Sequence, residues 1–371
     1  MKTDTGPTRS DTAYRPPEFS APPLAAAPDA RFAEVEADGV LPDGFFSTTN
    51  LPTYVKVAGR WQRPREPRMD SAIMLDGEGV LWVREARRLR RGERVAMGEA
   101  EDGSQGIYVH ADAFLKQRGA HEFRFMSTEV SRERPVQYDE MAAELIAERD
   151  RGGRVVWVAG PALVHARARA DLVWMIERKF VSVFLGGNAI AVHDLEAAIF
   201  GTTLGMTASG GAAAHGHGLH MRAINLIRRA GSIEAAVADG LVTNGVMHAL
   251  VTHGVPYVLA GSIRDDGPLP GVITDTVAAQ DAMRAHAVRA TYAVFVATAL
   301  HAIAVGNMLP AFVEDPEDRL RPLTTICVDQ TEFVVNKLRD RGTHQAHGVV
   351  TNAQDFMHVL RLYLERAEAR P

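Results

Sequence analysis

The feature that most constrains the fold of this 371-residue chain is an alternation of short apolar runs with helical segments after residue 137. Residues 155–159, VVWVA, and residues 257–260, YVLA, have the length and composition of buried strands. Parallel strands need long crossover connections, which are usually helices. The alternation therefore predicts an α/β fold with a doubly wound parallel sheet. The other predicted strands are residues 181–185, 292–297, 325–328 and 349–350.

The first third of the chain has a different pattern. Short apolar runs between residues 54 and 109 are separated by Gly, Pro and Asp turns, which predicts a β-rich domain over residues 31–136. Residues 1–30 are rich in Pro, Ala, Ser and Thr and lack an apolar core of signal-peptide length, so we expect a disordered tail there. The α/β domain then covers residues 137–371.

Composition argues against several classes of protein. A formal net charge of −5 gives no reason to expect nucleic acid or an acidic membrane surface as a partner. Cys327 is the only cysteine, which rules out an internal disulfide framework and a Cys-based zinc site and favours a packed core thiol. Residues 290–313 carry no Lys, Arg, Asp or Glu, but Gly306 and Pro310 interrupt them, so a strand and helix in a soluble core are favoured over a membrane span. We therefore expect a cytoplasmic protein without a membrane partner.

The charged loop after the strand at 257–260 is the first candidate site. Arg264, Asp265 and Asp266 precede a Gly-Pro-Leu-Pro segment that cannot continue a sheet. Thr274 is expected to cap the helix that follows. Ligands of open α/β sheets bind beyond the carboxyl ends of the strands, where this cluster would lie. A solvated turn is the alternative, because Asp, Gly and Pro are ordinary turn residues. The apolar face of the following helix is predicted at Ala278, Ala282, Ala285 and Val288.

Asp329, directly after the predicted strand at 325–328, is a candidate for nucleotide binding. The strand at 292–297 leads through a helix into this one. An acid at such a strand tip can bind the diol of a ribose and would repel a 2′-phosphate, which favours NAD over NADP. Many strands end in Asp, so the position alone does not decide the matter.

Other chemical motifs are weak. Gly216-His217-Gly218 follows a helix and so lacks the context of a dinucleotide-binding glycine loop, and the chain has no phosphate-binding P-loop. His215, His217 and His220 have no Glu or Cys at a familiar ligand spacing, so we expect no metal site. Two polar stretches beside aromatic residues, 45–50 and 125–134, suit either a pocket at a domain interface or ordinary turns and caps.

Longer stretches carry a family resemblance. GGNAIAVHDLEAAIFGTTLG, HMRAINLIRRAGSIEAAV, VLAGSIRDDGPLPGVITDTVAAQDAMRAH and ATALHAIAVGNMLP closely resemble the family that includes archaeal ornithine cyclodeaminase. They also resemble the carboxy-terminal part of cyanobacterial arginine dihydrolase–ornithine cyclodeaminase proteins. GFFSTTNLPT and FMSTEVSRERP resemble the lysine-ketoglutarate reductase/saccharopine dehydrogenase (LOR/SDH) conserved region. The resemblance covers about residues 35–365. It does not include the arginine-hydrolysing domain, so that activity is not transferred.

The resemblance implies a Rossmann-like fold and a tightly held NAD that is used catalytically. Hydride leaves the α-carbon of ornithine to give an α-imine, the δ-amine attacks it, ammonia departs, and hydride returns to give proline. Arg264 is then the candidate for the substrate carboxylate, unless it only neutralises its acidic neighbours, and Asp265 or His301 is the candidate for proton transfer. By motif position the cofactor-binding residues would be Asn188, Ala189, Asp266, Thr298, Ala299, Leu300, His301, Asp329, Val350 and Thr351.

The chain departs from the family pattern in two places. Residues 314–322 form an insertion that we expect to be a surface loop, and Asn352 stands where relatives often carry Asp. The alternatives to the cyclodeaminase are another NAD-dependent amino-acid or opine-type dehydrogenase and a nucleotide-binding regulator without turnover. We expect a small amino-acid substrate, a homo-oligomer and no nucleic-acid partner.

Overall fold

The computed structural model describes residues 14–114, 136–207, 210–214, 216–265, 267–314, 319–340 and 345–369. The chain divides into two compact units, each with a core of its own. Residues 1–135 and 307–323 form the first unit, and residues 136–306 and 324–371 form the second. Within the expected insertion at 314–322, Glu314 and Leu320–Pro322 are strand residues of a hairpin that belongs to the first unit, and residues 315–318 lie outside the described residues.

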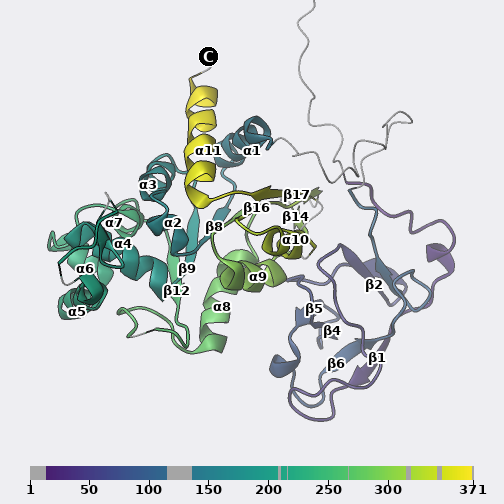
Figure 1. Ribbon diagram of the computed structural model, residues 1–371. Coiled ribbons are helices and arrows are strands. Elements are labelled where there is room, and N and C mark those ends of the chain that lie inside the picture. The colour runs from purple at the N-terminus through teal and green to yellow at the C-terminus, as the bar shows by residue number, and fades with distance from the viewer. Residues whose placement is uncertain are drawn as a thin grey trace, which may run out of the picture. The chain divides into compact units, whose positions relative to one another are not determined.

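The first unit is built from antiparallel strands (Figure 1). One sheet has the order β1 (Arg31–Glu34), β6 (Arg94–Met97), β4 (Ala72–Leu75), β5 (Leu81–Arg84). A second has the order β3 (Arg60–Gln62), β2 (Thr53–Val57), β7 (Ile107–Val109), and a hairpin pairs β14 (Phe312–Glu314) with β15 (Leu320–Pro322). Short 3-10 helices are η2 (Leu24–Ala26) and η3 (Ala86–Arg88). One buried cluster contains Ile73 and Leu81 from the first sheet and Val55 and Ile107 from the second, so the two sheets pack against each other.

Part of the expected disordered tail is ordered. Phe19 stacks on the ring of Trp61 with centroids 5.3 Å apart, and Leu24 in η2 is buried. Lys56 Nζ donates a hydrogen bond of 2.7 Å to the carbonyl of Ala27. The Pro and Ala content of this segment suggested disorder, but apolar anchors and several hydrogen bonds hold residues 14–30 in place. These include bonds from the N–H of Gly59 to the Asp29 carboxylate at 2.9 Å and from the N–H of Ala30 to the carbonyl of Lys56 at 2.9 Å.

The second unit contains a six-stranded parallel sheet. Its order is β12 (Tyr257–Ala260), β9 (Val183–Gly187), β8 (Val155–Ala159), β13 (Tyr292–Val296), β16 (Thr324–Asp329), β17 (Gln345–Val350). Numbered along the chain, this order is 3-2-1-4-5-6, which is that of a Rossmann fold, and the predicted doubly wound sheet is confirmed. The connections reverse direction between β8 and β13, so the crevice for a ligand is expected beyond the carboxyl ends of these strands.

Helices cover both faces of this sheet. Figure 1 shows α1 (Tyr138–Asp150), α3 (Arg169–Glu177) and α11 (Ala353–Glu368) on one side, and α8 (Thr276–Ala287), α9 (Ala299–Met308) and α10 (Glu332–Asp340) on the other. The remaining elements are α2 (Ala162–His165), α4 (Asn188–Phe200), the hairpin β10 (Thr202–Thr203) and β11 (Met206–Thr207), η5 (Gly216–Gly218), α5 (Leu219–Ala230), α6 (Ile233–Ala238) and α7 (Val246–Thr252). Among the described residues no helix has the length and hydropathy needed to cross a bilayer.

The sequence of β8 follows from this double covering. All five of its residues are fully buried, as expected for a strand with helices over both faces. Burial of one large apolar side chain stabilises a fold by about 1.5–3 kcal/mol, so a polar substitution here would be severe. The one polar atom of Trp157, Nε1, donates a hydrogen bond of 2.9 Å to the carbonyl of Phe180. Cys327 is also buried, which raises the pKa of its thiol to about 12 and agrees with a packed core residue.

The helix after the charged loop begins one residue later than predicted. Asp275, not Thr274, is its N-cap: the Asp275 carboxylate accepts a hydrogen bond of 2.7 Å from the backbone N–H of Ala278. The buried face is accordingly formed by Ala279, Met283 and Ala287 rather than by the predicted alanines. The predicted face is displaced by one residue, about 100° around the helix, because alanines occur on both faces of this segment and do not mark the buried one.

Candidate active site at the carboxyl edge of the sheet

The turn between β13 and α9 lies directly over the end of β8. Ala297 has a φ of 58°, a left-handed conformation that is rare for alanine, and it turns the chain into the first turn of α9. A Cβ atom at Gly160 would lie 2.0 Å from the carbonyl oxygen of Ala297 and 2.9 Å from Cβ of Thr298. Only glycine therefore fits at the end of β8, and Gly160 allows the two neighbouring strand ends to meet at the switch point.

His301 reaches across this edge from α9 to the end of β9. A Cβ atom at Gly187 would lie 2.6 Å from Cε1 of the His301 ring, so the ring occupies the space above that glycine. Burial lowers the pKa of His301, and the Asp265 carboxylate acts in the opposite direction, with burial the larger effect. The imidazole is therefore neutral at pH 7, with both nitrogens available for hydrogen bonding or proton transfer.

The loop that follows β12 is fixed at both ends. It leaves at Ala260 and returns beside the strand, where the N–H of Gly261 donates to the carbonyl of Ile273 at 2.8 Å. The Oδ1 atom of Asn188, at the start of α4, accepts a hydrogen bond of 3.0 Å from the N–H of Leu269. Asn188 is buried and ties this loop to the end of β9. Ala189 follows it in the first turn of α4.

Arg264 and Asp265 stand in the outer part of this loop. The Asp265 carboxylate accepts a hydrogen bond of 2.7 Å from the N–H of Ser262, and the N–H of Arg264 donates to Oγ of Ser262 at 3.2 Å. Arg264 is exposed, and its guanidinium forms no ion pair with Asp265 or with any other acid in the described part of the chain. Asp266, expected to contact the cofactor, lies outside the described residues.

Asp329 is the last residue of β16, in register with Val350 at the end of β17. Its Oδ1 atom accepts hydrogen bonds from the N–H of Thr331 at 3.0 Å and from Oγ1 of Thr331 at 2.9 Å. The N–H of Thr351 donates to the backbone carbonyl of Asp329 at 3.0 Å. The carboxylate therefore has one oxygen committed to the start of α10, while Oδ2 forms no hydrogen bond with another described residue.

This part of the edge combines features that suit a dinucleotide. The first N–H groups of α9, which begins at Ala299, have no acceptor within the helix, and a helix N-terminus of this kind favours phosphate groups. Three large apolar side chains near Asp329 and the start of α9 are exposed: Leu300 by 71%, Phe333 by 72% and Val350 by 53%. Asp329 at the end of β16 suits a ribose, and the first N–H groups of α9 suit a pyrophosphate. The exposed apolar side chains suit the base of such a ligand.

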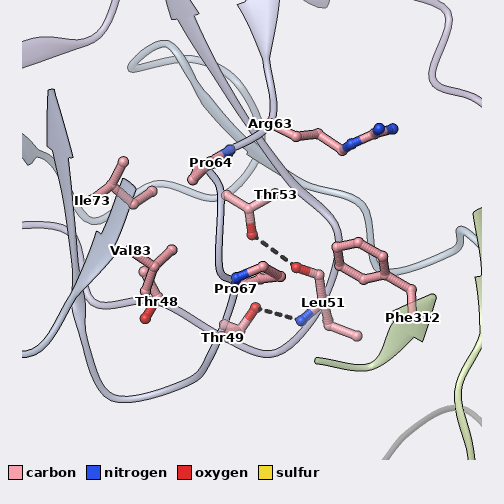
Figure 2. Close-up of a pocket in the computed structure, with 10 residues that line it drawn as sticks. All are labelled: Thr48, Thr49, Leu51, Thr53, Arg63, Pro64, Pro67, Ile73, Val83 and Phe312. Atoms are coloured by element: carbon pink, nitrogen blue, oxygen red, sulfur yellow. Dashed lines mark hydrogen bonds between the residues drawn. The ribbon is translucent and has the colours of Figure 1, made fainter. Parts of the chain in front are cut away.

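The polar stretch at residues 45–50 of the first unit is used to build a loop. Figure 2 shows Thr49 accepting a hydrogen bond from the N–H of Leu51, and Thr53 donating one to the carbonyl of Leu51. Thr48 Oγ1 donates to the carbonyl of Arg68 at 2.7 Å. The cavity beside these residues has a volume of about 10 Å³, enough for roughly one water molecule. The structure shows turns of the first unit at residues 48–53; the second polar stretch, residues 125–134, lies outside the described residues.

Two residues of this edge were not selected from the sequence. Gly160 and Gly187 are required by close contacts and not by an unusual backbone conformation. The available signal was that both predicted strands end in glycine, at Gly160-Pro161 and Gly186-Gly187-Asn188. A glycine at the end of a parallel strand often marks a close approach of other chain segments.

Comparison with known proteins identifies the family. The family model described as arginine dihydrolase ArgZ-like, C-terminal, Rossmann fold, matches residues 139–360, and the model of the first region of the same C-terminal part matches residues 52–139. An ornithine cyclodeaminase from Methanopyrus kandleri is 43% identical over 342 residues, which cover 91% of this chain and 79% of that protein.

Solved structures agree with this assignment. The crystal structure of a conserved LOR/SDH protein from Methanococcus maripaludis S2 has a TM-score of 0.80 and 36% identity, covering 92% of this chain and 98% of that one. A ternary complex of AgrE with ornithine and NAD⁺ has a TM-score of 0.59 and 36% identity, covering 94% of this chain and 47% of that one. AgrE of Nostoc sp. is named as a bifunctional arginine dihydrolase/ornithine cyclodeaminase. The chain therefore belongs to the family formed by the archaeal ornithine cyclodeaminases and the C-terminal region of ArgZ-like arginine dihydrolases.

Proposed function

We propose that this protein converts L-ornithine to L-proline and ammonia with NAD as a catalytic cofactor. The proposal rests on the carboxyl ends of the strands in the parallel sheet, which has the strand order of a Rossmann fold. Asp329, the start of α9, and the loop with Arg264 and Asp265 each come directly after one of these strands. The family supports it, because its relatives are named as ornithine cyclodeaminases and AgrE binds ornithine and NAD⁺ together. Fold alone would not decide the substrate.

The residues that would hold NAD lie along β13, α9 and β16. Asp329 Oδ2 would accept hydrogen bonds from a ribose diol, and the N–H groups of Thr298, Ala299 and Leu300 would face the pyrophosphate. A 2′-phosphate would meet the Asp329 carboxylate, which favours NAD over NADP. When bound, NAD supplies reversible acceptance and return of a hydride. Val350 and Thr351, at the adjacent strand end, would contact the adenosine part.

The substrate would be held by the loop after β12. The planar guanidinium of Arg264 can bind the α-carboxylate of an amino acid with two parallel hydrogen bonds, and no described acid competes for it. His301 is neutral because burial lowers its pKa, so it can accept a proton from a substrate ammonium. Asp265 would stabilise the imidazolium that forms, because its carboxylate raises the pKa of His301. Its own position is set by the N–H of Ser262.

One assay tests this function against its alternatives. The protein is incubated with ornithine and NAD, and proline, ammonia and NADH are measured. Proline and ammonia in equal amounts, without net NADH, are the expected result. Net NADH accumulation would indicate an amino-acid dehydrogenase instead. Binding of NAD without any product would indicate a nucleotide-binding regulator, and the cyclodeaminase proposal would be withdrawn.

A further inference from the structure

A second cavity lies in the α/β unit, away from the residues proposed to bind NAD and ornithine. Its volume is about 670 Å³, a size typical of small-molecule sites. Its walls come from α2, α3, the C-terminal half of α4, the β10–β11 hairpin and the residues just before α7. None of the candidate active-site residues lines it.

The walls are held by two buried carboxylates that do not face the cavity. Asp194 accepts hydrogen bonds from the N–H groups of Val246 at 2.9 Å and Met247 at 2.8 Å, which fixes α7 against α4. Glu196 accepts from Oγ1 of Thr202 at 2.8 Å and from two backbone N–H groups of the hairpin. Neither side chain has any exposed surface. These hydrogen bonds join protein groups to one another and so fix the walls of the cavity.

The polar groups that remain are cationic or neutral. No Asp or Glu occurs among the described residues that line the cavity. Arg169 is paired with Asp194 and Asn244, whereas Arg167 is exposed and forms no ion pair with any described residue. The ring centroids of His165 and His193 lie 4.5 Å apart, and burial, with a smaller effect from His193, lowers the pKa of His165, so His165 supplies a hydrogen bond and no charge. Val164 and Val173 form an apolar wall.

Arg167 occupies a position that disfavours arginine. It follows α2 with a φ of 63°, and its N–H donates to the carbonyl of Val164 in a C-terminal cap that normally selects glycine. The exposed side chain of Arg167 lines the cavity and forms no ion pair with a described acid, so its charge is available to a ligand. Lys179 has the same φ and the same cap after α3, but it lines no part of the cavity. The chain thus contains its own matched control.

We propose that this cavity binds a small organic anion, with an apolar body against Val164 and Val173 and a carboxylate paired with Arg167. His165 would add a hydrogen bond from the side of the cavity. The proposal does not depend on the reaction at the carboxyl edge of the sheet. It requires only that the cavity distinguish an anion from a neutral molecule of the same shape.

Calorimetric titration with benzoate and with benzamide tests this selectivity. The two probes have nearly the same shape and differ in charge. We expect saturable benzoate binding in the millimolar range or tighter, and benzamide binding at least tenfold weaker. Equal binding of the two probes, or no saturable benzoate binding by the unaltered protein, would overturn the proposal.

Variants locate the site. Arg167→Gly removes the cation and relieves the left-handed strain, and it should weaken benzoate binding at least tenfold. Lys179→Gly relieves the same strain and should leave binding unchanged, and both variants should fold. Ala170→Trp should fill the exposed rim of the cavity and abolish binding while keeping Arg167. Undiminished affinity in Arg167→Gly would disprove the role of Arg167. Benzoate binding should also be unchanged in Asp329→Asn and Arg264→Lys, and its loss there would assign the probe to the active site instead.

Discussion

The imidazole ring of His301 fills the space that a side chain at Gly187 would need. A Cβ atom built on Gly187 approaches Cε1 of the ring to 2.6 Å, closer than real Cβ contacts allow. The backbone of Gly187, with φ of −100° and ψ of 169°, is extended and open to any residue. Glycine at this position is therefore needed to keep the ring where it lies and not for the conformation of the chain.

Gly187→Ala should displace His301 without unfolding the protein. We expect ornithine turnover to fall by about tenfold or more, because a catalytic group moved by about 1 Å can lose two orders of magnitude in rate. The melting temperature should change little, since the ring can rotate away from the new methyl group. Gly77→Ala is the control, because a Cβ atom there meets nothing within 4 Å. Normal turnover in Gly187→Ala would remove His301 from the reaction.

Asp329→Asn should reduce cofactor selectivity while keeping α10 in place. The asparagine retains an oxygen for the hydrogen bonds from Thr331 but loses the charge that opposes a 2′-phosphate. We expect NAD affinity to fall by roughly tenfold, equivalent to about 1.4 kcal/mol, and the preference for NAD over NADP to narrow. Both are measured by calorimetry. The control is Thr331→Val, which removes the hydroxyl donor and should affect only the stability of α10. If Asp329→Asn leaves the ratio of NAD to NADP affinity unchanged, the ribose binds elsewhere.

The sequence was sufficient to predict the parallel sheet because its strands are continuous apolar runs. β8 is buried along its whole length, and its short run of five apolar residues is typical of a strand with both faces covered. β17 was predicted only at 349–350, although the strand begins at Gln345, because its first half is polar. His347 lies in that half and bonds Glu144 of α1 at 3.2 Å. A strand held by a side-chain contact 203 residues away in the sequence has no local apolar signature.

In the candidate site too, features with a local sequence pattern could be predicted, and features that depend on long-range contacts could not. Asp329 could be predicted because it directly follows an apolar run in the sequence, and no long-range contact is needed to see this. The contact between Gly187 and His301 joins residues of β9 and α9, and the pairing of Asn188 with Leu269 joins two loops. The assignment of residues 312–314 and 320–322 to the first unit likewise depends on long-range packing. None of these relationships has a period or a spacing that a single sequence displays.

Arg264→Lys should separate substrate binding from structure. Lysine keeps the charge but cannot form two parallel hydrogen bonds with a carboxylate. We expect the KM for ornithine to rise or kcat to fall by about tenfold, with NAD affinity and melting temperature nearly intact. Ser262→Ala is the structural control, because it removes the hydroxyl that accepts from the N–H of Arg264. If Arg264→Lys lowers stability and NAD affinity together with activity, the guanidinium is structural.

Stability should decrease as the solution becomes mildly acidic. Burial lowers the pKa values of His165 and His301, and burial with Arg154 and Arg289 nearby lowers that of His286. Each of these histidines is thus protonated more readily in the unfolded chain than in the folded one. Unfolding therefore takes up protons below about pH 6.5, the ordinary histidine pKa, and the free energy of unfolding falls until the folded-state pKa values are passed.

Urea unfolding at a series of pH values measures this effect. The midpoint should be nearly constant above pH 7 and should move to lower urea on acidification toward pH 5.5. His301→Gln removes one of the three groups, so its midpoint should depend less on pH than that of the unaltered protein. A midpoint that rises on acidification would contradict the direction of all three shifts.

Asp194→Asn should be among the most destabilising single-atom changes in the α/β unit. The Asp194 carboxylate is fully buried and accepts from Nε of Arg169 at 2.5 Å and from the N–H groups of Val246 and Met247. An asparagine offers one acceptor oxygen and places an NH₂ group against a backbone donor. It also leaves the Arg169 charge without its partner. Loss of such a buried pair costs about 3–5 kcal/mol, toward the lower end here because Arg169 keeps some solvent contact.

A surface ion pair provides the comparison. Arg361 and Glu365 are joined at 2.8 Å within α11, and Glu365→Gln should cost less than about 0.5 kcal/mol because both side chains remain in contact with water. A double-mutant cycle of Asp194→Asn with Arg169→Gln then isolates the buried interaction. We expect the double variant to be more stable than the sum of the single losses implies, because Arg169→Gln removes the unpaired charge. Strict additivity would mean that α7 is held by the two backbone hydrogen bonds alone.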